Sequence, residues 1–443
     1  MASAVLLDAR TGIVTDLVPR PLPARAPEPL RLWQARLSDT AMFSPWPGDP
    51  VASGCGWWSN DAARLAALGE AVERYCGALA PRGLVPTSAA QLASAGQRVL
   101  EVSALALFSQ RQYRTPGFPF VPFTPDLPLR WVTGRELPTG EPCAVPLNLV
   151  YTAIHRTAPN GTAPPGAYGD EPRTNPLPYA GLAAGTSREQ AETNALLELI
   201  ERDAIATSSL SGARWSEIIV PDALAELFGK KSDTLTVRLF HVPAVIRTPV
   251  VAALVEDPVT DFLALGTAAR TDPTHAALKS VAEACQLHLM LTALDDPDSA
   301  LMRLAATEPS CPLMPWRADR RYRDSYDRDD WRDVRDLACQ LQLYLDPDIR
   351  ALFRSRLRGL PTMQLNDLAT SSCTTTALLD ALRAIDIAPV SIDVTTTDVR
   401  AADWTVVRVV APGLYPNTPA AFPTLGGTRV PHQAESSLPL PYA

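Results

Sequence analysis

The 443-residue sequence lacks several features that would place it in a common class of protein. No run approaches the roughly 18 apolar residues of a membrane-spanning helix, and the apolar stretch at the N-terminus is too short for a signal peptide. The net charge of −8 argues against a generally basic surface for nucleic acid. The seven cysteines form no CxxC pair and the five histidines no HExxH motif, so neither a disulfide framework nor a zinc site is predicted. We therefore expect a cytoplasmic protein with reduced thiols that binds neither membrane nor nucleic acid.

The most informative feature that the sequence does contain is a repeated pattern, ExxER. It occurs from Glu70 to Arg74 and again from Glu198 to Arg202, each time among apolar residues. Residues three apart share a helix face, so each copy directs two carboxylates the same way. A single copy is typical of a surface helix with an internal salt bridge. Two matched copies would instead bury four carboxylates, which favours a divalent cation such as Mg²⁺.

A third polar helix face is predicted after residue 272. Asp272 and Pro273 are a good helix cap and first helical residue. Lys279, Glu283 and Gln286 follow at spacings of four and three residues, so they share one face of an otherwise apolar helix. An exposed ion pair would explain this helix alone, but beside the two ExxER helices it becomes a candidate part of the same site.

The remaining sequence alternates strand and helix signals, which predicts an α/β fold. Ser187 and Gln190 form a candidate capping box at the start of the second ExxER helix. Residues 53–56 are expected to form a small glycine loop, either a tight turn or a phosphate-binding turn. Residues 340–345 are predicted as a strand and 156–178 as a long loop. Cys55 and Cys76 flank the first ExxER helix as a candidate nucleophile or, preferably, as small buried apolar residues.

These motifs together resemble the YcaO family, and in particular its cyclodehydratase branch, the D proteins. The similarity covers residues 7–14, 69–77, 181–204, 393–413 and 425–429. Members of this family bind ATP and magnesium through paired ExxER helices and an RxxxE helix, so the absence of a P-loop motif does not exclude nucleotide binding. The resemblance implies a YcaO-type α/β fold of mixed sheets, with internally pseudo-symmetric halves around an ATP/Mg site. The implied organisation is an N-terminal strand and proline-rich arm (1–50), a catalytic core (51–432) and a proline-containing C-terminal tail (433–443).

The resemblance also implies roles for individual residues. The implied magnesium ligands are Glu70, Glu73, Glu198 and Glu201. The implied nucleotide-binding residues are these four with Arg74, Asn194, Arg202, Lys279, Glu283 and Gln286. The implied catalytic residues are Glu201, Arg202, Glu283 and Pro441. The chain departs from the family pattern at Ala66, Ala180, Asn194, Lys279 and Ala443, the last of which leaves the PxPxP tail without its final proline.

The activity implied by the resemblance is ATP-dependent activation of backbone amides in a ribosomally made precursor peptide. A Cys, Ser or Thr side chain would cyclise to a thiazoline or oxazoline. Two alternatives stay open: a thioamide- or amidine-forming enzyme, and a non-catalytic scaffold subunit of a peptide-modifying complex. The implied partners are the precursor peptide, an E1-like or leader-binding protein, an FMN-dependent azoline oxidase and a second copy of the chain in a homodimer.

Overall fold

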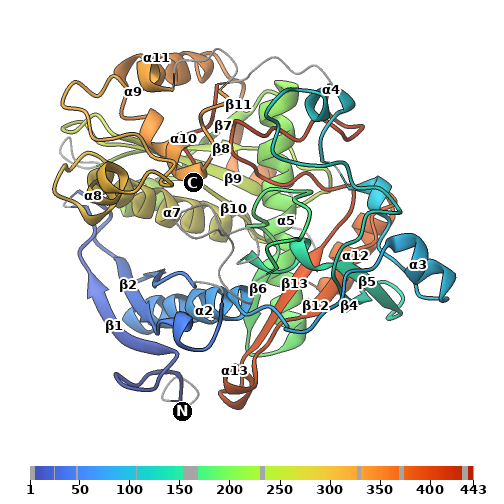
Figure 1. The fold of residues 1–443 in the computed structure, drawn as a ribbon. Helices are drawn as coiled ribbons and strands as arrows, with labels where there is room; N and C mark the ends of the chain where they lie inside the picture. Colours follow the sequence, from blue (N-terminus) through green and yellow to red (C-terminus); the bar gives the residue numbers. More distant parts are fainter. Residues whose placement is uncertain are drawn as a thin grey trace.

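The computed structural model describes residues 5–23, 25–45, 48–105, 107–152, 168–229, 235–326, 331–368, 374–431 and 438–442. The expected long loop and the expected C-terminal tail each lie partly outside these ranges. Three sheets and several long helices make up the structure, as the predicted α/β class requires (Figure 1). No helix within the described ranges is long and apolar enough to cross a membrane.

The first sheet is a three-stranded antiparallel meander packed on one long helix, α2 (Asn60–Ala78). Its strands are β1 (Val14–Arg20), β2 (Leu30–Leu37) and β3 (Val51–Trp57). The prediction of a glycine loop at residues 53–56 was wrong, because these residues lie within β3. A Cβ atom on Gly54 would lie 2.0 Å from the amide nitrogen of Ala67. The glycine is therefore required for close contact between strand and helix. Ahead of this sheet, Leu7 forms one isolated bridge with Val14.

The second sheet has five strands in the order β10-β9-β8-β7-β11, and only the β7–β11 pair is parallel. Its strands are β7 (Ser216–Ile219), β8 (Thr236–His241), β9 (Val250–Glu256), β10 (Leu263–Ala269) and β11 (Thr362–Gln364). Helix α7 (Pro273–Leu294) packs on β9 and β10 and also contacts β3. Asp272 caps this helix by accepting the amide of His275, which confirms the predicted start.

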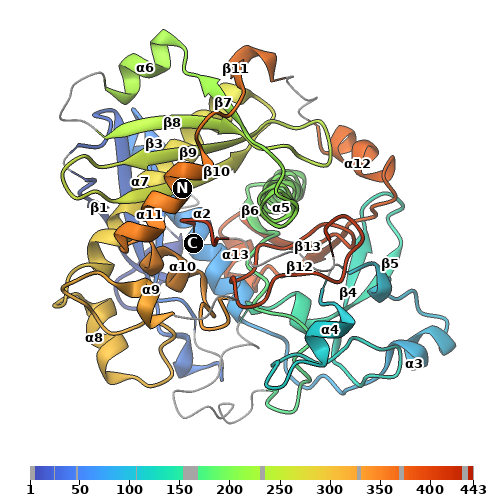
Figure 2. The same ribbon diagram turned by 90° about the horizontal axis from the view of Figure 1, so that it is seen from above.

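The third sheet is antiparallel throughout, in the order β5-β4-β12-β13-β6. Its strands are β4 (Trp131–Glu136), β5 (Pro142–Pro146), β6 (Leu182–Gly185), β12 (Val390–Asp393) and β13 (Thr405–Val410). Helix α5 (Arg188–Ser211) packs on β6 and β13 and also contacts β10. Helix α5 therefore joins the second and third sheets, and it stands between them in both views (Figures 1 and 2).

Shorter helices complete the fold. They are α3 (Ala89–Ser94), α4 (Gln110–Tyr113), α6 (Asp222–Phe228), α8 (Ala300–Thr307), α9 (Tyr322–Ser325), α10 (Leu337–Leu343), α11 (Pro347–Arg356), α12 (Thr375–Arg383) and α13 (Thr397–Ala401). The predicted strand at residues 340–345 was wrong, because most of it belongs to α10. Gln340 and Gln342 alternate with leucines in the sequence but are buried. Their side-chain amides donate to the carbonyls of Tyr442 and Met314, at 3.3 and 2.8 Å.

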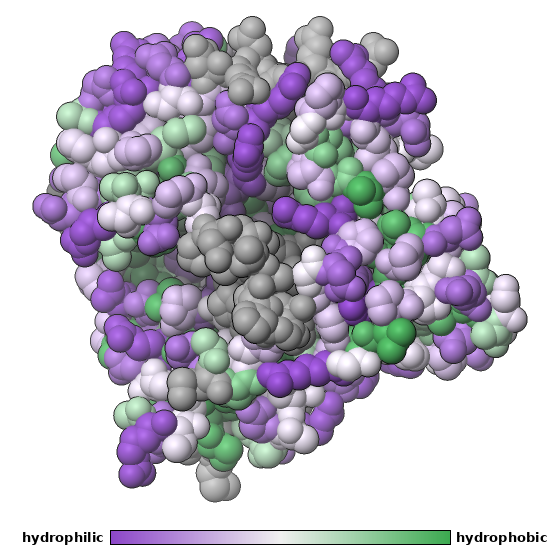
Figure 3. Space-filling view, viewed as in Figure 1, coloured by the Kyte–Doolittle hydropathy of each residue, from purple (hydrophilic) through white to green (hydrophobic). Residues whose placement is uncertain are grey.

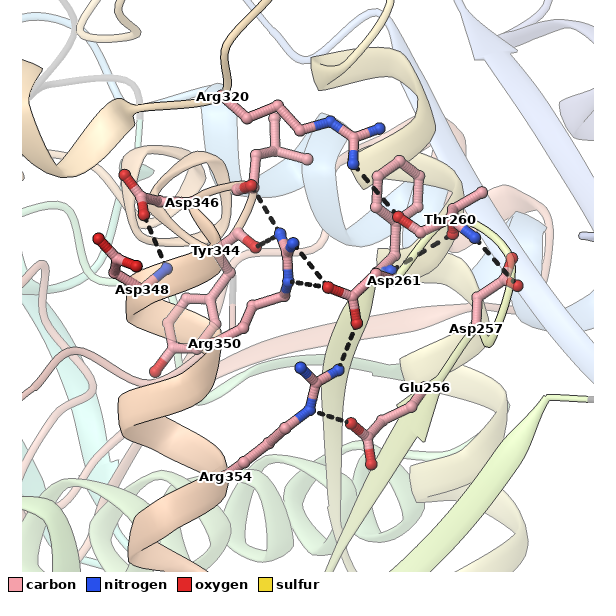
Figure 4. A network of polar contacts seen from close by, with 12 residues as sticks. Glu256, Asp257, Thr260, Asp261, Arg320, Tyr344, Asp346, Asp348, Arg350 and Arg354 are labelled. Atoms are coloured by element: carbon pink, nitrogen blue, oxygen red, sulfur yellow. Dashed lines mark hydrogen bonds and ion pairs between the residues drawn. The ribbon is translucent and has the colours of Figure 1, made fainter.

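A polar network fixes α11 against the turn between β9 and β10 (Figure 4). Arg350, almost fully buried, donates to Asp261 Oδ2 at 2.8 Å and to the carbonyls of Tyr344 and Leu345. Arg354 donates to Asp261 Oδ1 and to Glu256 Oε1, both at 2.7 Å. These charge-assisted bonds hold the β9–β10 hairpin in place. Strand β10 in turn supplies partners to the site described next.

Candidate nucleotide and metal site

Helix α2 carries the first pair of carboxylates. Ser59 caps the helix by accepting a hydrogen bond from the amide of Ala62. Small apolar residues form the buried face of the helix. Glu73 accepts the Ala184 amide of β6 at 2.6 Å. Glu70 accepts Arg74 Nε at 2.9 Å and the Ser53 amide at 3.2 Å. The two carboxylates of the first ExxER are therefore held by neighbouring strands, β6 and β3.

Helix α5 carries the second pair. Ser187 accepts the amide of Gln190 as predicted, although the Gln190 side chain accepts the amide of Thr186 instead of closing a reciprocal box. Glu198 accepts the Gly181 amide at 2.9 Å. Glu201, 5% exposed, accepts the Thr267 hydroxyl at 2.5 Å and the Ala269 amide at 3.2 Å. Glu201 therefore points inward at β10 and not into solvent.

Electrostatic interactions link these acids across the helices. Burial raises the pKa of Glu73 to about 8, and the nearby carboxylates of Glu70 and Glu198 contribute to the shift. Burial likewise raises the pKa of Glu201 to about 7, with Glu283 and Glu198 adding to the shift while Arg202 opposes it. Acids that raise the pKa of one another lie close together in a poorly solvated region. Such perturbed groups are typical of functional sites.

The arrangement fits a magnesium ion that arrives with a nucleotide better than a preformed metal cage. Within the described ranges, no group of three or more His, Cys, Asp or Glu side chains is placed to hold an ion. Each of the four carboxylates accepts a hydrogen bond from the protein. Mg²⁺ usually uses one or two carboxylates together with phosphate oxygens and water. Residues from the predicted ligand set Glu70, Glu73, Glu198 and Glu201 would then bind the ion jointly with phosphate.

Helix α7 presents the third predicted set. Lys279 Nζ lies 3.1 Å from Glu283 Oε1, and this pairing raises the pKa of Lys279. Gln286 donates to the sulfur of Cys55 at 3.1 Å. Burial raises the pKa of Cys55 to about 12, so its thiol stays protonated at neutral pH. The structure thus favours the small apolar role of Cys55 over a nucleophile, and burial raises the pKa of Cys76 to about 11 in the same way.

Arg202 lies between the carboxylates and the C-terminal tail. Its Nη2 is 3.6 Å from Glu198 Oε1 and its Nε is 3.9 Å from Glu201 Oε1. That Nε is buried and has no hydrogen-bond partner among the described residues. The ring of Tyr442 covers the guanidinium at 4.6 Å, and the Tyr442 hydroxyl donates to Glu201 Oε1 at 3.4 Å. Arg202 therefore has a spare donor for a ligand.

The two remaining predicted residues lie at the edges of the site. Asn194 is exposed, and its amide donates to the carbonyl of Ala184 at 3.2 Å, on the strand that also holds Glu73. Pro441 is buried, and its carbonyl accepts the amide of Leu265 in β10 at 3.0 Å. Pro441 therefore anchors the tail to β10 through its backbone.

One buried residue of the site was missed in the sequence. Arg408 of β13 is fully buried, and it donates to the carbonyls of Val150 at 3.0 Å and Ala180 at 2.5 Å. Its Nη2 has no partner within the described ranges. Burial lowers the pKa of Arg408 to about 10, against the opposing effect of Glu198 and Glu73. The available signal was an arginine alone in the apolar strand segment VVRVV.

Four acids that accept backbone amides, the nearby cations and a polar helix face fit the class of proteins that bind a nucleotide with magnesium. The family model described as YcaO cyclodehydratase, ATP- and Mg²⁺-binding, matches residues 54–415. The chain belongs to the YcaO family, and ATP and Mg²⁺ are the ligands of that family. No curated protein sequence matches the chain.

Solved structures share the fold at low sequence identity. A heterocyclase in complex with substrate and cofactor is 20% identical, with a TM-score of 0.65 over 99% of this chain. The chain spans only 56% of that heterocyclase. The YcaO protein of Methanopyrus kandleri, bound with AMPPCP and Mg²⁺, is 20% identical with a TM-score of 0.57, covering 91% of this chain and 86% of that one. The E. coli microcin synthetase McbBCD complex gives 15% identity and a TM-score of 0.56, covering 98% of each chain.

Proposed function

We propose that this chain uses ATP to activate backbone amides of a ribosomally made precursor peptide, cyclising Cys, Ser or Thr to thiazoline or oxazoline. The observation that carries the proposal is the placement of Glu198 within electrostatic reach of both Glu73 and Glu201, beside the unpaired Nε of Arg202. Such a site suits a polyphosphate with its metal ion, since catalysis of phosphoryl transfer depends mainly on positioning and charge neutralisation.

ATP supplies the phosphoryl group that turns the amide oxygen into phosphate, a far better leaving group than hydroxide. The thiol or hydroxyl of the peptide would add to the preceding carbonyl carbon and lose its proton. The phosphorylated oxygen would then leave as phosphate while the amide nitrogen loses its proton and forms the C=N bond of the azoline, and ADP would remain. The chain's own residues bind and orient. Members of the set Glu70, Glu73, Glu198 and Glu201 would hold the metal, Arg202 and Lys279 would neutralise phosphate charge, and Tyr442 keeps Arg202 in place.

A separate partner protein would recruit the precursor. The McbBCD complex, solved also with pro-MccB17 bound, is a multi-subunit assembly in which a chain of this fold and length occurs. We propose an E1-like or leader-binding partner on this basis. A homodimer and an FMN-dependent oxidase that converts azolines to azoles are further proposals drawn from the family resemblance.

The test is mass spectrometry of the precursor peptide encoded near the gene, incubated with the chain, its partner and MgATP. Loss of one water per modified Cys, Ser or Thr, dependent on ATP, is the expected result. Exchange of oxygen for sulfur would instead identify a thioamide-forming enzyme. An unmodified peptide, together with no thermal stabilisation by millimolar MgATP, would overturn the proposal and favour a scaffold subunit.

A further inference from the structure

A groove of about 550 Å³ runs beside the carboxylate site and has no assigned role. Its walls come from residues 109–118 around α4, 205–210 of α5, 331–332 with Gln340, 416–425, and the tail residues 439–442. The face drawn in Figure 3 is hollowed above its centre, with hydrophilic side chains around the opening. The volume lies in the range of sites that bind small molecules or short peptide segments.

The groove ends at the carboxylate site. Tyr442 lines the groove, and the same side chain covers Arg202 and donates to Glu201. Asp203 follows Arg202 in the chain and is fully buried. It accepts a hydrogen bond from the amide of Tyr415 at 2.8 Å and forms an ion pair with Arg429. The groove lining on α5 begins at Ile205, three residues after Arg202 of the carboxylate site.

Two buried polar groups in the groove lining have no hydrogen-bond partner among the described residues. They are Nδ2 of Asn417 and Oγ1 of Thr424. Thr424 is only 1% exposed. Unsatisfied buried polar groups are rare in folded proteins, because each costs about 1–3 kcal/mol. One amide donor and one hydroxyl in a groove match the carbonyl and N–H groups of a peptide backbone.

The charge of the lining also restricts the ligand. Arg111 and Arg332 line the groove, and no Asp or Glu occurs among its described lining residues. This contrasts with the net charge of −8 for the whole chain. The groove therefore disfavours a cationic ligand and suits a neutral or acidic one.

We propose that this groove binds an extended segment of the substrate peptide, adjacent to the residue being modified. Asn417 and Thr424 hydrogen-bond the peptide backbone, and the reacting amide lies at the Tyr442 end, next to Glu201 and Arg202. The inference rests on the proposed function and adds the site at which the peptide is held. Recognition through backbone groups would let one groove accept peptide segments that differ in their side chains.

The test uses isosteric variants of the unpaired groups. Thr424→Val and Asn417→Leu, assayed in the complex with the partner protein and MgATP, are expected to lower kcat/KM for the precursor peptide by roughly three- to tenfold each. That is the size expected for one lost hydrogen bond. Thr424→Ser, which keeps the hydroxyl, should retain wild-type kcat/KM. Neither Thr424→Val nor Asn417→Leu should lower the melting temperature or reduce its increase with MgATP, because the removed groups are unpaired in the free protein and cost free energy when buried.

A matched control is available at Thr248, whose hydroxyl is also buried and unpaired among the described residues but lies outside the groove. Thr248→Val should leave kcat/KM unchanged. Wild-type kcat/KM in both groove variants, or an equal loss in Thr248→Val, would overturn the inference. A change of sedimentation coefficient in the groove variants would overturn it too, because the groove would then hold a second copy of the chain. Failure of the wild-type complex to modify any precursor would instead contradict the proposed function.

Discussion

The ring of Tyr442 lies 4.6 Å from the guanidinium of Arg202, although about 240 residues separate them in the chain. The Tyr442 hydroxyl reaches Glu201 in the same motif, and the preceding Pro441 is hydrogen-bonded to β10. The C-terminal tail is therefore part of the carboxylate site. A change at Pro441 or Tyr442 should therefore alter the site, although the described tail residues 438–442 include no Asp or Glu.

Tyr442→Ala should lower kcat for ATP hydrolysis by roughly three- to thirtyfold. A desolvated cation–π contact is worth about 0.5–2 kcal/mol, and its loss lets Arg202 move away from the position that it occupies here. Tyr442→Phe, which keeps the ring and loses only a 3.4 Å hydrogen bond, should lose less than about threefold. Steady-state ATP hydrolysis measures both. Equal rates for Tyr442→Ala and the wild type would show that the tail has no part in turnover.

Glu201→Gln should reduce ATP turnover by at least about a hundredfold. A neutral amide cannot neutralise the positive charge of a metal ion, and it cannot stabilise the charge that develops in the transition state. The variant should still fold, since the neutral side chain of Gln carries no charge that must be removed from water on folding. Circular dichroism and thermal melting check folding. Glu192→Gln is the control on the same helix: Glu192 is equally buried but pairs with Arg135 and Arg188. A Glu201→Gln protein with wild-type turnover would refute the site.

The stability of the metal-free protein should fall as pH rises. The folded-state pKa values of about 8 for Glu73 and about 7 for Glu201 lie above the ordinary value of 4.5. The folded state therefore binds more protons than the unfolded state between these values. The contribution of protonated Glu73 and Glu201 to the free energy of unfolding is fully present below pH 4.5 and is lost as pH rises through about 7 and 8. Urea unfolding at about pH 6 and about pH 8.5 measures the change.

The double variant Glu73→Gln/Glu201→Gln supplies the reference for that experiment. It should show a smaller loss of stability between the two pH values than the wild type, because neither amide titrates. Saturating MgATP should also reduce the loss in the wild type, since a cation favours the ionised carboxylates. Parallel pH profiles for the wild type and the double variant would contradict the raised pKa values.

Arg408→Met should lower the free energy of unfolding by about 1–3 kcal/mol for each carbonyl left unpaired, at Val150 and Ala180. It should also reduce the thermal shift produced by MgATP, because a positive charge near Glu73 and Glu198 is lost. Arg408→Lys keeps the charge and should retain more of the nucleotide shift than Arg408→Met. Differential scanning fluorimetry with and without MgATP measures both quantities. An identical nucleotide shift in the two variants would exclude an electrostatic role.

The helices of the site could be predicted because their signals are local. Serine and aspartate caps mark where α2, α5 and α7 begin, and the i, i+3 spacing places each pair of acids on one face. The structure adds the contacts between residues that are far apart in the sequence. The amides of Ala184 and Gly181, which hold Glu73 and Glu198, come from β6 and the residue before it, and the position of β6 depends on the third sheet.

The errors arose where tertiary packing overrides a local pattern. Gly54 and Gly56 suggest a turn, but they lie in a strand that needs close approach to α2. Gln340 and Gln342 alternate with leucines, a pattern typical of a half-exposed strand. In the structure they lie in a buried helix, and their side-chain amides are hydrogen-bonded to backbone carbonyls. Arg408 gave no local signal of its neighbours, because its partners come from segments 228 and 258 residues earlier.

Arg202 and Asp203 are neighbours in α5, yet Arg202 lies beside Glu198 and Glu201 whereas Asp203 is bonded to the 415–429 segment. A helix transmits rotation and translation along its axis with little distortion. We therefore expect a displacement of α5 to move the 415–429 segment as well, because Asp203 accepts the amide of Tyr415 and pairs with Arg429. The proposed nucleotide site and the proposed peptide groove would then affect each other directly through this helix.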